Sequence, residues 1–170
     1  MEFRALINDA GHPGAAMSRL VELARDAVPG CHWAAATAWP AGNRPQTRSY
    51  TGDVARGTDG LQYDVGEGPC SAASLGNGPI HVRDLVAENR WSSFRAAALL
   101  DGAVRGTMSY QLTGEPGRLT LTLYAARPDV FDHVAFTTGA RFAEHTAALA
   151  QLVENAHDAT TPYGDGRRGP

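Results

Sequence analysis

The chain has 170 residues, of which 43% are hydrophobic and 19% are charged, a composition typical of one globular domain with a proper core. Its formal net charge of −3 provides no broad basic field, which argues against direct nucleic-acid binding. It has two cysteines, no apolar run near the roughly 20 residues that span a bilayer, and no signal-peptide pattern at its start. We therefore expect one cytoplasmic domain that is not inserted in a membrane.

The first third of the chain predicts a helix followed by a hairpin. After an N-terminal segment, residues 1–13, in which residues 2–7 can form one helical turn, apolar residues recur at spacings of three and four over 15–28. Pro29-Gly30 ends this helix. Residues 31–39 are apolar on both alternating faces and indicate a buried strand, whereas the polar residues 44–50 indicate an edge strand.

The middle of the chain predicts short elements. Residues 51–60 are rich in Gly, Asp and Thr and indicate a loop with at most one helical turn. Two glycines and a proline within 61–73 then indicate a sharp turn into a short helix, 69–75. A short strand over 79–83 and a helix over 91–100 follow, with Trp91, Phe94 and Ala98 turned inward.

The last third predicts a second hairpin and a long helix. Alternating strands at 104–112 and 118–124 flank a turn, and a helix with a wide apolar stripe runs from Asp132, a suitable N-cap, to about His157. The width of the stripe suggests contact with a second subunit. Residues 158–170 indicate a disordered tail. Together these elements predict an α+β fold: an antiparallel sheet with the terminal helices on one face and loops and short helices on the other.

One string in the chain resembles a known family. The string Gln62-Tyr63-x-x-Gly66-Glu67-Gly68-Pro69-Cys70 resembles the GAF domains of actinobacteria, and so do 21–30, 79–85, Arg90-Trp91 and Phe94. The likeness covers roughly 14–153 and is strongest to the GAF portion of the GAF–ANTAR transcription regulators. It implies a sensory domain over 14–157, with a ligand pocket on the face opposite the terminal helices and a regulatory role.

Three departures limit what the resemblance implies. The RNA-binding ANTAR module would need several tens of helical residues after Val153, so RNA binding is not carried over. Thr122 stands where related sequences usually have asparagine, and it lacks an amide's paired donor and acceptor. His133 stands where an acidic residue is usual near the start of the last helix, which removes a charge that the helix dipole favours.

Cys70 has two interpretations. Its place near a helix start could lower the pKa of its thiol and make it reactive, but a free cysteine more often packs as a small buried hydrophobe, which we favour. Some GAF relatives hold a bilin through a cysteine, but the neighbours here do not match those sites. The GAF-fold free methionine sulfoxide reductase works with more cysteines than this chain has, and Cys31 is a poor resolving thiol unless the two are adjacent.

Other catalytic patterns are weak. The six histidines show no metal-ligand spacing, and Gly66-Glu67-Gly68-Pro69-Cys70 lacks the lysine of a phosphate-binding loop. Asp84, Glu88 and Asp101 form no acid–base pair with a nucleophile. We therefore expect no metal site and no enzymatic activity.

A group of aromatic residues gives the best candidate ligand site. Trp91, Phe94, Tyr110 and Tyr124 could line a pocket between the sheet and the loops, although each alone is more simply explained as core packing. Ser109, Gln111 and Thr122 could supply polar contacts. The candidate ligand-binding residues are Cys70, Trp91, Phe94, Met108, Tyr110, Thr122 and Tyr124.

The sequence thus predicts a GAF-type sensory or regulatory domain that binds an unidentified small molecule or signalling protein. We expect it to signal through its terminal helices as a homodimer. Two alternatives stay open, a ligand-free GAF-fold interaction module and a thiol-based reductase. A closed pocket with a dimer interface would favour the first alternative, and two cysteines within disulfide reach beside an open cleft would favour the second.

Overall fold

A computed structural model describes residues 12–115 and 117–160, and the helical turn expected at 2–7 lies outside them. The elements, in chain order, are α2 (Pro13–Ala27), β1 (Trp33–Trp39), β2 (Gln46–Tyr50), α3 (Asp53–Val65), α4 (Pro69–Ser74), β3 (Ile80–Val82), the 3₁₀ turn η2 (Leu85–Ala87), α5 (Ser92–Asp101), β4 (Gly106–Thr113), β5 (Arg118–Ala125) and α6 (His133–Thr160).

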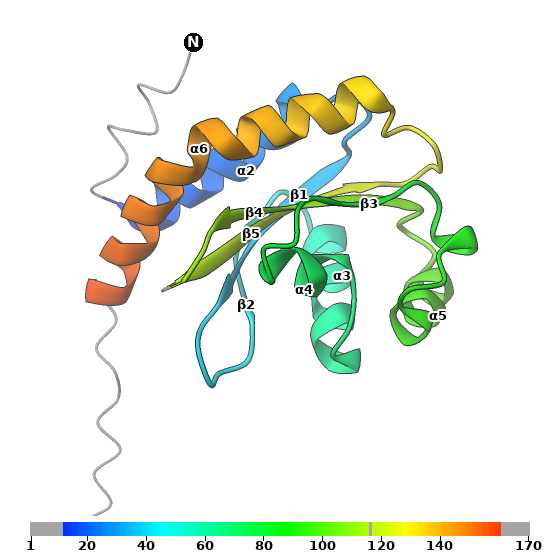
Figure 1. Ribbon diagram of the computed structural model, residues 1–170, viewed down its shortest axis with the longest axis horizontal. Coiled ribbons are helices and arrows are strands. Elements are labelled where there is room, and N and C mark those ends of the chain that lie inside the picture. The colour runs from blue at the N-terminus through cyan, green and yellow to red at the C-terminus, as the bar shows by residue number, and fades with distance from the viewer. Residues whose placement is uncertain (1–11, 116, 161–170) are drawn as a thin grey trace, which may run out of the picture.

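Within the described residues, the strands form one five-stranded antiparallel sheet in the order β2-β1-β5-β4-β3. The terminal helices α2 and α6 lie side by side on one face, and α3, α4 and α5 lie on the other (Figure 1). The α+β prediction is therefore confirmed. The face that carries α2 and α6 is called the helix face below, and the opposite face is called the inner face.

The strand patterns explain the order of the sheet. β1 is buried on both faces from Ala34 to Ala38 because α2 packs on one face and α3 on the other, as its apolar sequence predicts. The polar β2 lies at an edge, also as predicted. At the other edge, β3 pairs only with Thr107 to Ser109 of β4.

The two faces of the sheet have different chemistry. On the helix face, alanines of β1 and large side chains of β4 and β5 pack against α2 and α6 in one apolar cluster that includes Met108, Tyr110 and Leu121. On the inner face, a smaller cluster joins Tyr124 to Phe94 of α5. Hydroxyl-bearing residues occupy most of the remaining inner-face positions, as described below.

Two predicted elements differ from the structure. The segment 51–60 is not a loop: it forms most of α3, whose buried residues are Ala55, Thr58, Asp59 and Gln62. Their spacing is helical, but three of the four are polar, so the apolar pattern gives no signal. At the other end, α6 continues to Thr160, so residues 158–160 belong to this helix and not to the expected tail, while 161–170 lie outside the described residues.

Candidate functional site

A buried carboxylate, Asp59 of α3, lies at the centre of the inner face. Its Oδ2 accepts hydrogen bonds from the hydroxyls of Thr37 and Thr47, each at 2.9 Å, and of Tyr63 at 3.3 Å. Its Oδ1 accepts one from the hydroxyl of Tyr124. Burial raises the pKa of Asp59, although its hydrogen bonds with these hydroxyls oppose the shift. The network joins α3 to β1, β2 and β5.

Gln62, one turn further along α3, links this network to α4. Its Nε2 donates to the hydroxyl of Tyr124 at 3.1 Å, and its Oε1 accepts from the backbone N–H of Cys70 at 2.8 Å. A Cβ at Gly68 would lie 2.4 Å from that Oε1, and Gly68 has a φ of +147°. The glycine is therefore required for the close approach of the Gln62 side chain.

Glu67, in the same turn, holds the start of α5. Its Oε1 accepts hydrogen bonds from the backbone N–H groups of Ser93 at 2.7 Å and Phe94 at 3.3 Å. These N–H groups have no partner within their own helix, and a carboxylate at this end is also favoured by the helix dipole. The string that resembles GAF domains thus connects three helices by hydrogen bonds.

Hydroxyl groups cover the centre of the inner face. The Sγ of Cys70 and the Nε1 of Trp39 each lie 3.0 Å from the hydroxyl of Thr120, and Ser109 and Thr122 are joined by a 3.0 Å hydrogen bond. The hydroxyl of Thr107 is buried and has no hydrogen-bond partner among the described residues. Such residues are unusual in a purely structural core, where apolar side chains are the rule.

The protein's own side chains fill this space. Asp59, Cys70, Phe94 and Tyr124 are each 0% exposed, and Gln62 is 1% exposed. These residues therefore border no void large enough for water. The inner face is closed in this conformation.

The structure places the seven candidate ligand-binding residues on both faces of the sheet. Cys70, Trp91, Phe94, Thr122 and Tyr124 lie on the inner face. Met108 and Tyr110 instead pack in the helix-face cluster, because side chains alternate along β4. The expectation that all seven line one space is therefore corrected, since two of them face α6.

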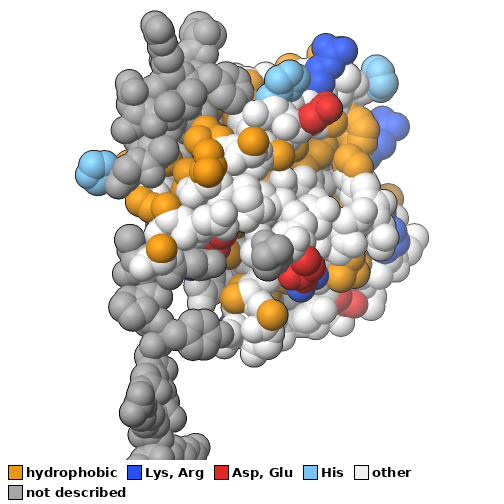
Figure 2. Space-filling model, turned by 60° about the vertical axis from the view of Figure 1, so that its left-hand side comes forward, with side chains coloured by type: hydrophobic (Ala, Val, Ile, Leu, Met, Phe, Trp, Pro, Cys, Tyr) orange, Lys and Arg blue, Asp and Glu red, His pale blue; other side chains and the backbone are white. Residues whose placement is uncertain are grey.

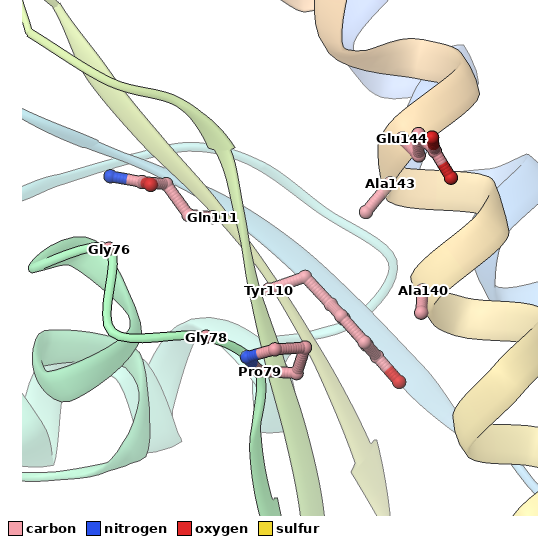
Figure 3. A pocket seen from close by; sticks show the side chains of 8 residues that line it. All are labelled: Gly76, Gly78, Pro79, Tyr110, Gln111, Ala140, Ala143 and Glu144. Atoms are coloured by element: carbon pink, nitrogen blue, oxygen red, sulfur yellow. The ribbon is translucent and has the colours of Figure 1, made fainter.

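Figure 3 shows this alternation directly, at a hollow of about 240 Å³ between α6 and the edge of the sheet. Tyr110 points toward α6 and Ala140, whereas Gln111 points the opposite way toward Gly76. The Nε2 of Gln111 donates to the carbonyl of Ser74, at the end of α4, at 3.1 Å. This hollow lies outside the space that the sequence predicts as a ligand pocket.

The two cysteines lie on opposite faces of the sheet. Cys31 packs against the helix-face cluster, and Cys70 contacts Thr120 on the inner face. They are also far apart along the strands. Cys70 contacts Thr120, which is paired with Thr37 of β1. Cys31 lies six residues before Thr37, which is about 20 Å along an extended chain. Burial raises the pKa of each thiol to about 12, so both remain protonated near neutral pH.

Sequence reasoning missed the centre of the inner-face network. The sequence prediction did not include Asp59, Thr37 or Thr47. Asp59 was missed because 51–60 was expected to be a loop. Thr37 was missed because it is a single threonine in a strand that is otherwise apolar. The signal that could have found them is the helical spacing of Ala55, Asp59 and Gln62. That spacing carries polar side chains to the sheet.

Other kinds of site have no support among the residues that the structure describes. Over 12–115 and 117–160, no group of three or more His, Cys, Asp or Glu side chains is placed to hold a metal ion. No described helix combines the length and the apolar character needed to cross a membrane.

Comparison with known proteins identifies the fold. No protein-family model matches the chain, and no curated protein sequence matches it. Solved structures do match. The type II free methionine-R-sulfoxide reductase from Thermoplasma acidophilum aligns with a TM-score of 0.64 at 14% identity, over 86% of this chain and 95% of the enzyme.

GAF domains also match, with slightly lower TM-scores. The GAF domain of an Acinetobacter phosphoenolpyruvate-protein phosphotransferase aligns with a TM-score of 0.59 at 12% identity, over 92% of each chain. The GAF domain of the cyanobacteriochrome TePixJ gives 0.60 at 14% identity, over 85% of this chain and 90% of that domain. The chain has a GAF-like fold. At these identities the likeness fixes the architecture and leaves the activity open, because this fold includes both sensory domains and an enzyme.

Proposed function

We propose that this protein is a GAF-fold regulatory module that acts by associating with another protein chain, in the first place a second copy of itself, through the layer formed by α2 and α6. The closed inner face carries this proposal. A space filled by Asp59, Gln62 and Tyr124, which are hydrogen-bonded to one another, offers no room for a resident ligand. Regulation then has to act through an outer surface.

The helix layer offers such a surface. With 28 residues, α6 is about 42 Å long, whereas an eight-residue strand spans about 26 Å, so part of α6 extends past the sheet (Figure 1). Leu152 in the last third of α6 is 63% exposed, and Val134 near the other end is 59% exposed. On the side of the molecule where α6 ends, hydrophobic side chains form several groups (Figure 2). A second helix layer would cover them.

A second candidate function is small-molecule sensing on the inner face after it opens. The buried hydroxyls favour it, since binding sites carry polar groups that a core avoids. Thr107 favours it most, because its hydroxyl has no partner within 12–115 and 117–160. Thiol chemistry has less support, because two protonated thiols on opposite faces cannot exchange a disulfide without rearrangement of the sheet. We place the module in the cytoplasm, in line with its two free cysteines.

Native mass spectrometry of the protein purified from its own host tests the two candidates together, because one spectrum reports subunit count and retained mass. A dimer without added mass supports the proposal. A dimer that retains a small molecule supports both candidates, and a monomer that retains one supports sensing instead. A monomer of bare mass contradicts the association of a second copy through α2 and α6.

Leu152→Glu tests the surface itself. Introducing a carboxylate at this exposed leucine should convert the dimer to a monomer while the thermal unfolding midpoint stays within a few degrees. Leu100→Glu is the matched control, because Leu100 is 90% exposed on α5, away from the helix layer. If Leu100→Glu dissociates the dimer and Leu152→Glu does not, the dimer interface is not formed by α2 and α6.

A further inference from the structure

A larger hollow lies at the other end of α6, against the outer edge of β3. Its volume is about 600 Å³, within the range of roughly 300–1,000 Å³ that is typical of small-molecule sites. Two arginines, two histidines and two phenylalanines make up most of its lining: Arg83, Arg90, His81, His133, Phe131 and Phe136. This combination points to a ligand with a charged part and an apolar part.

Both arginines that line the hollow are held by carboxylates that do not line it. The Nε and Nη2 atoms of Arg90 donate to the two oxygens of Glu88 at 2.9 and 2.6 Å, and its guanidinium lies 4.4 Å from the centre of the Trp91 ring. Arg83 donates to Asp129 at 2.9 Å. These contacts orient the guanidinium groups in advance, which lowers the entropy lost when a ligand binds.

The hollow also contains a histidine, an acid and the start of a helix. Burial and the nearby Arg83 lower the pKa of His81, so its ring is neutral near pH 7. The ring of His81 stacks on Phe136 with 5.7 Å between centroids, and its buried Nε2 has no partner among the described residues. The acid in the lining, Asp132, accepts a hydrogen bond from the N–H of Ala135 at 2.9 Å and so caps α6. The start of α6, the positive end of its dipole, borders the hollow.

We propose that this hollow binds a small organic anion, a carboxylate or phosphate monoester carried on a flat apolar body. Arg83 and Arg90 bond the anionic group, and Phe131 and Phe136 cover the apolar body. The pair of Arg83 with Asp129 does not prevent this, since their side chains are 71% and 59% exposed and exposed pairs contribute little. The site lies apart from the closed inner face and does not rest on the proposed function.

Binding of phenyl phosphate, benzoate and inorganic phosphate to the full chain, measured by calorimetry, tests the proposal. The wild-type protein should bind phenyl phosphate or benzoate saturably, and whichever binds more tightly identifies the anionic group. Inorganic phosphate should bind at least about tenfold more weakly than phenyl phosphate, because it lacks the apolar body. Equal binding of these two phosphates would overturn the assignment of an organic anion.

Arg83→Gln locates the site. The variant should bind the tighter organic probe at least about tenfold more weakly, because a charge-assisted hydrogen bond is lost. Arg56→Gln is the matched control: Arg56 is also an exposed arginine paired with an aspartate, Asp53, but it lies on α3. It should bind as the wild type does. An equal loss in both variants, or no saturable binding by the wild type, would overturn the proposal.

Histidine NMR signals give a second readout that does not depend on the variants. Addition of the probe should shift the ring signals of His81 and His133, which line the hollow, and should leave those of His145 in place, because that ring bonds the carbonyl of Arg141 further along α6. Shifts confined to His145 would place the anion elsewhere and contradict the proposal.

Discussion

At the scale of single residues, Cys70 contributes its backbone more than its thiol. Its N–H donates to the Oε1 of Gln62, and its buried, protonated Sγ contacts the hydroxyl of Thr120. The neighbouring Gly68 is needed because the Gln62 side chain lies directly against it. The most distinctive string of this sequence is thus explained by the geometry of a turn between three helices, without any chemical reaction.

Gly68→Ala should destabilise the protein by about 2–4 kcal/mol. The added Cβ would lie 2.4 Å from the Oε1 of Gln62, so this side chain has to move away from Cys70 and Tyr124, and Gly68 has a positive φ that alanine disfavours. Urea unfolding measures the loss as a change in the free energy of unfolding.

The control for this variant is Gly57→Ala. Gly57 is exposed on α3 and a Cβ there would meet nothing within 4 Å, so alanine should stabilise the helix by about 0.5–1 kcal/mol. Equal losses in both variants would mean that the close contact between Gly68 and Gln62 is not the cause.

At the scale of elements, the sequence correctly predicts the helices and strands that bury a periodic apolar face. The two hairpins, α2, α5 and α6 each bury an apolar face, and each was expected within a few residues of its observed bounds. The turn into a short helix was predicted correctly, because Gly66 and Gly68 allow positive φ angles and Pro69 suits a first helical turn. Residues 61–65 of the same string instead form the end of α3.

The same reasoning fails where an element buries polar side chains. α3 turns Thr58, Asp59 and Gln62 toward a sheet face that is itself rich in hydroxyls, so hydrogen bonds replace hydrophobic contacts. Which hydroxyls meet Asp59 depends on strand register and helix placement, which are long-range properties. The candidate ligand-binding residues predicted from the sequence came from both faces of the sheet for a related reason. The assignment of Tyr110 to a face depends on the register of β4 and on which face α6 covers.

A buried ion pair joins the edge strand β2 to the far part of α6. Arg48 donates to Glu154 at 2.7 and 3.2 Å, and their side chains are 16% and 4% exposed. Glu154→Gln should therefore destabilise the protein by about 1.5–3 kcal/mol, because it replaces charge-assisted hydrogen bonds between Arg48 and Glu154 with neutral ones. Hydrogen exchange should also become faster in the α6 turns that follow Glu154.

The double variant Arg48→Met with Glu154→Leu separates the charge effect from packing. Removing both charges while keeping the volume apolar should return the free energy of unfolding to within about 1 kcal/mol of the wild type. If the double variant is as unstable as Glu154→Gln, the pair contributes through its packing and not through its charge-assisted hydrogen bonds.

At the scale of the whole molecule, the sheet separates two cores of opposite chemistry. The helix face is apolar and tied to α2 and α6, whereas the inner face is held by a carboxylate that accepts hydrogen bonds from four hydroxyls. Titration of one inner-face group should therefore change the stability of the entire fold, because α3 is joined through Asp59 to three strands.

The pH dependence of stability tests this view of Asp59. Burial raises its pKa in the folded protein above the value of about 3.9 expected for the unfolded chain, so the folded state binds this proton more tightly. The stability from this group is then fully present below about pH 4 and is lost as the pH rises through the folded pKa. Asn at this position cannot titrate, so the stability of the wild type relative to Asp59→Asn should fall between pH 4 and 7.

Urea unfolding of both proteins across this range measures that difference. Groups that are the same in both proteins cancel from it. Glu88 is an example with the opposite sign: the hydrogen bond from Arg90 lowers its pKa, so its contribution is lost as the pH falls. A difference that stays constant or grows with pH would mean that the four hydroxyls stabilise the ionised carboxylate of Asp59 more than burial disfavours it, and the inner face would then hold a permanent buried charge.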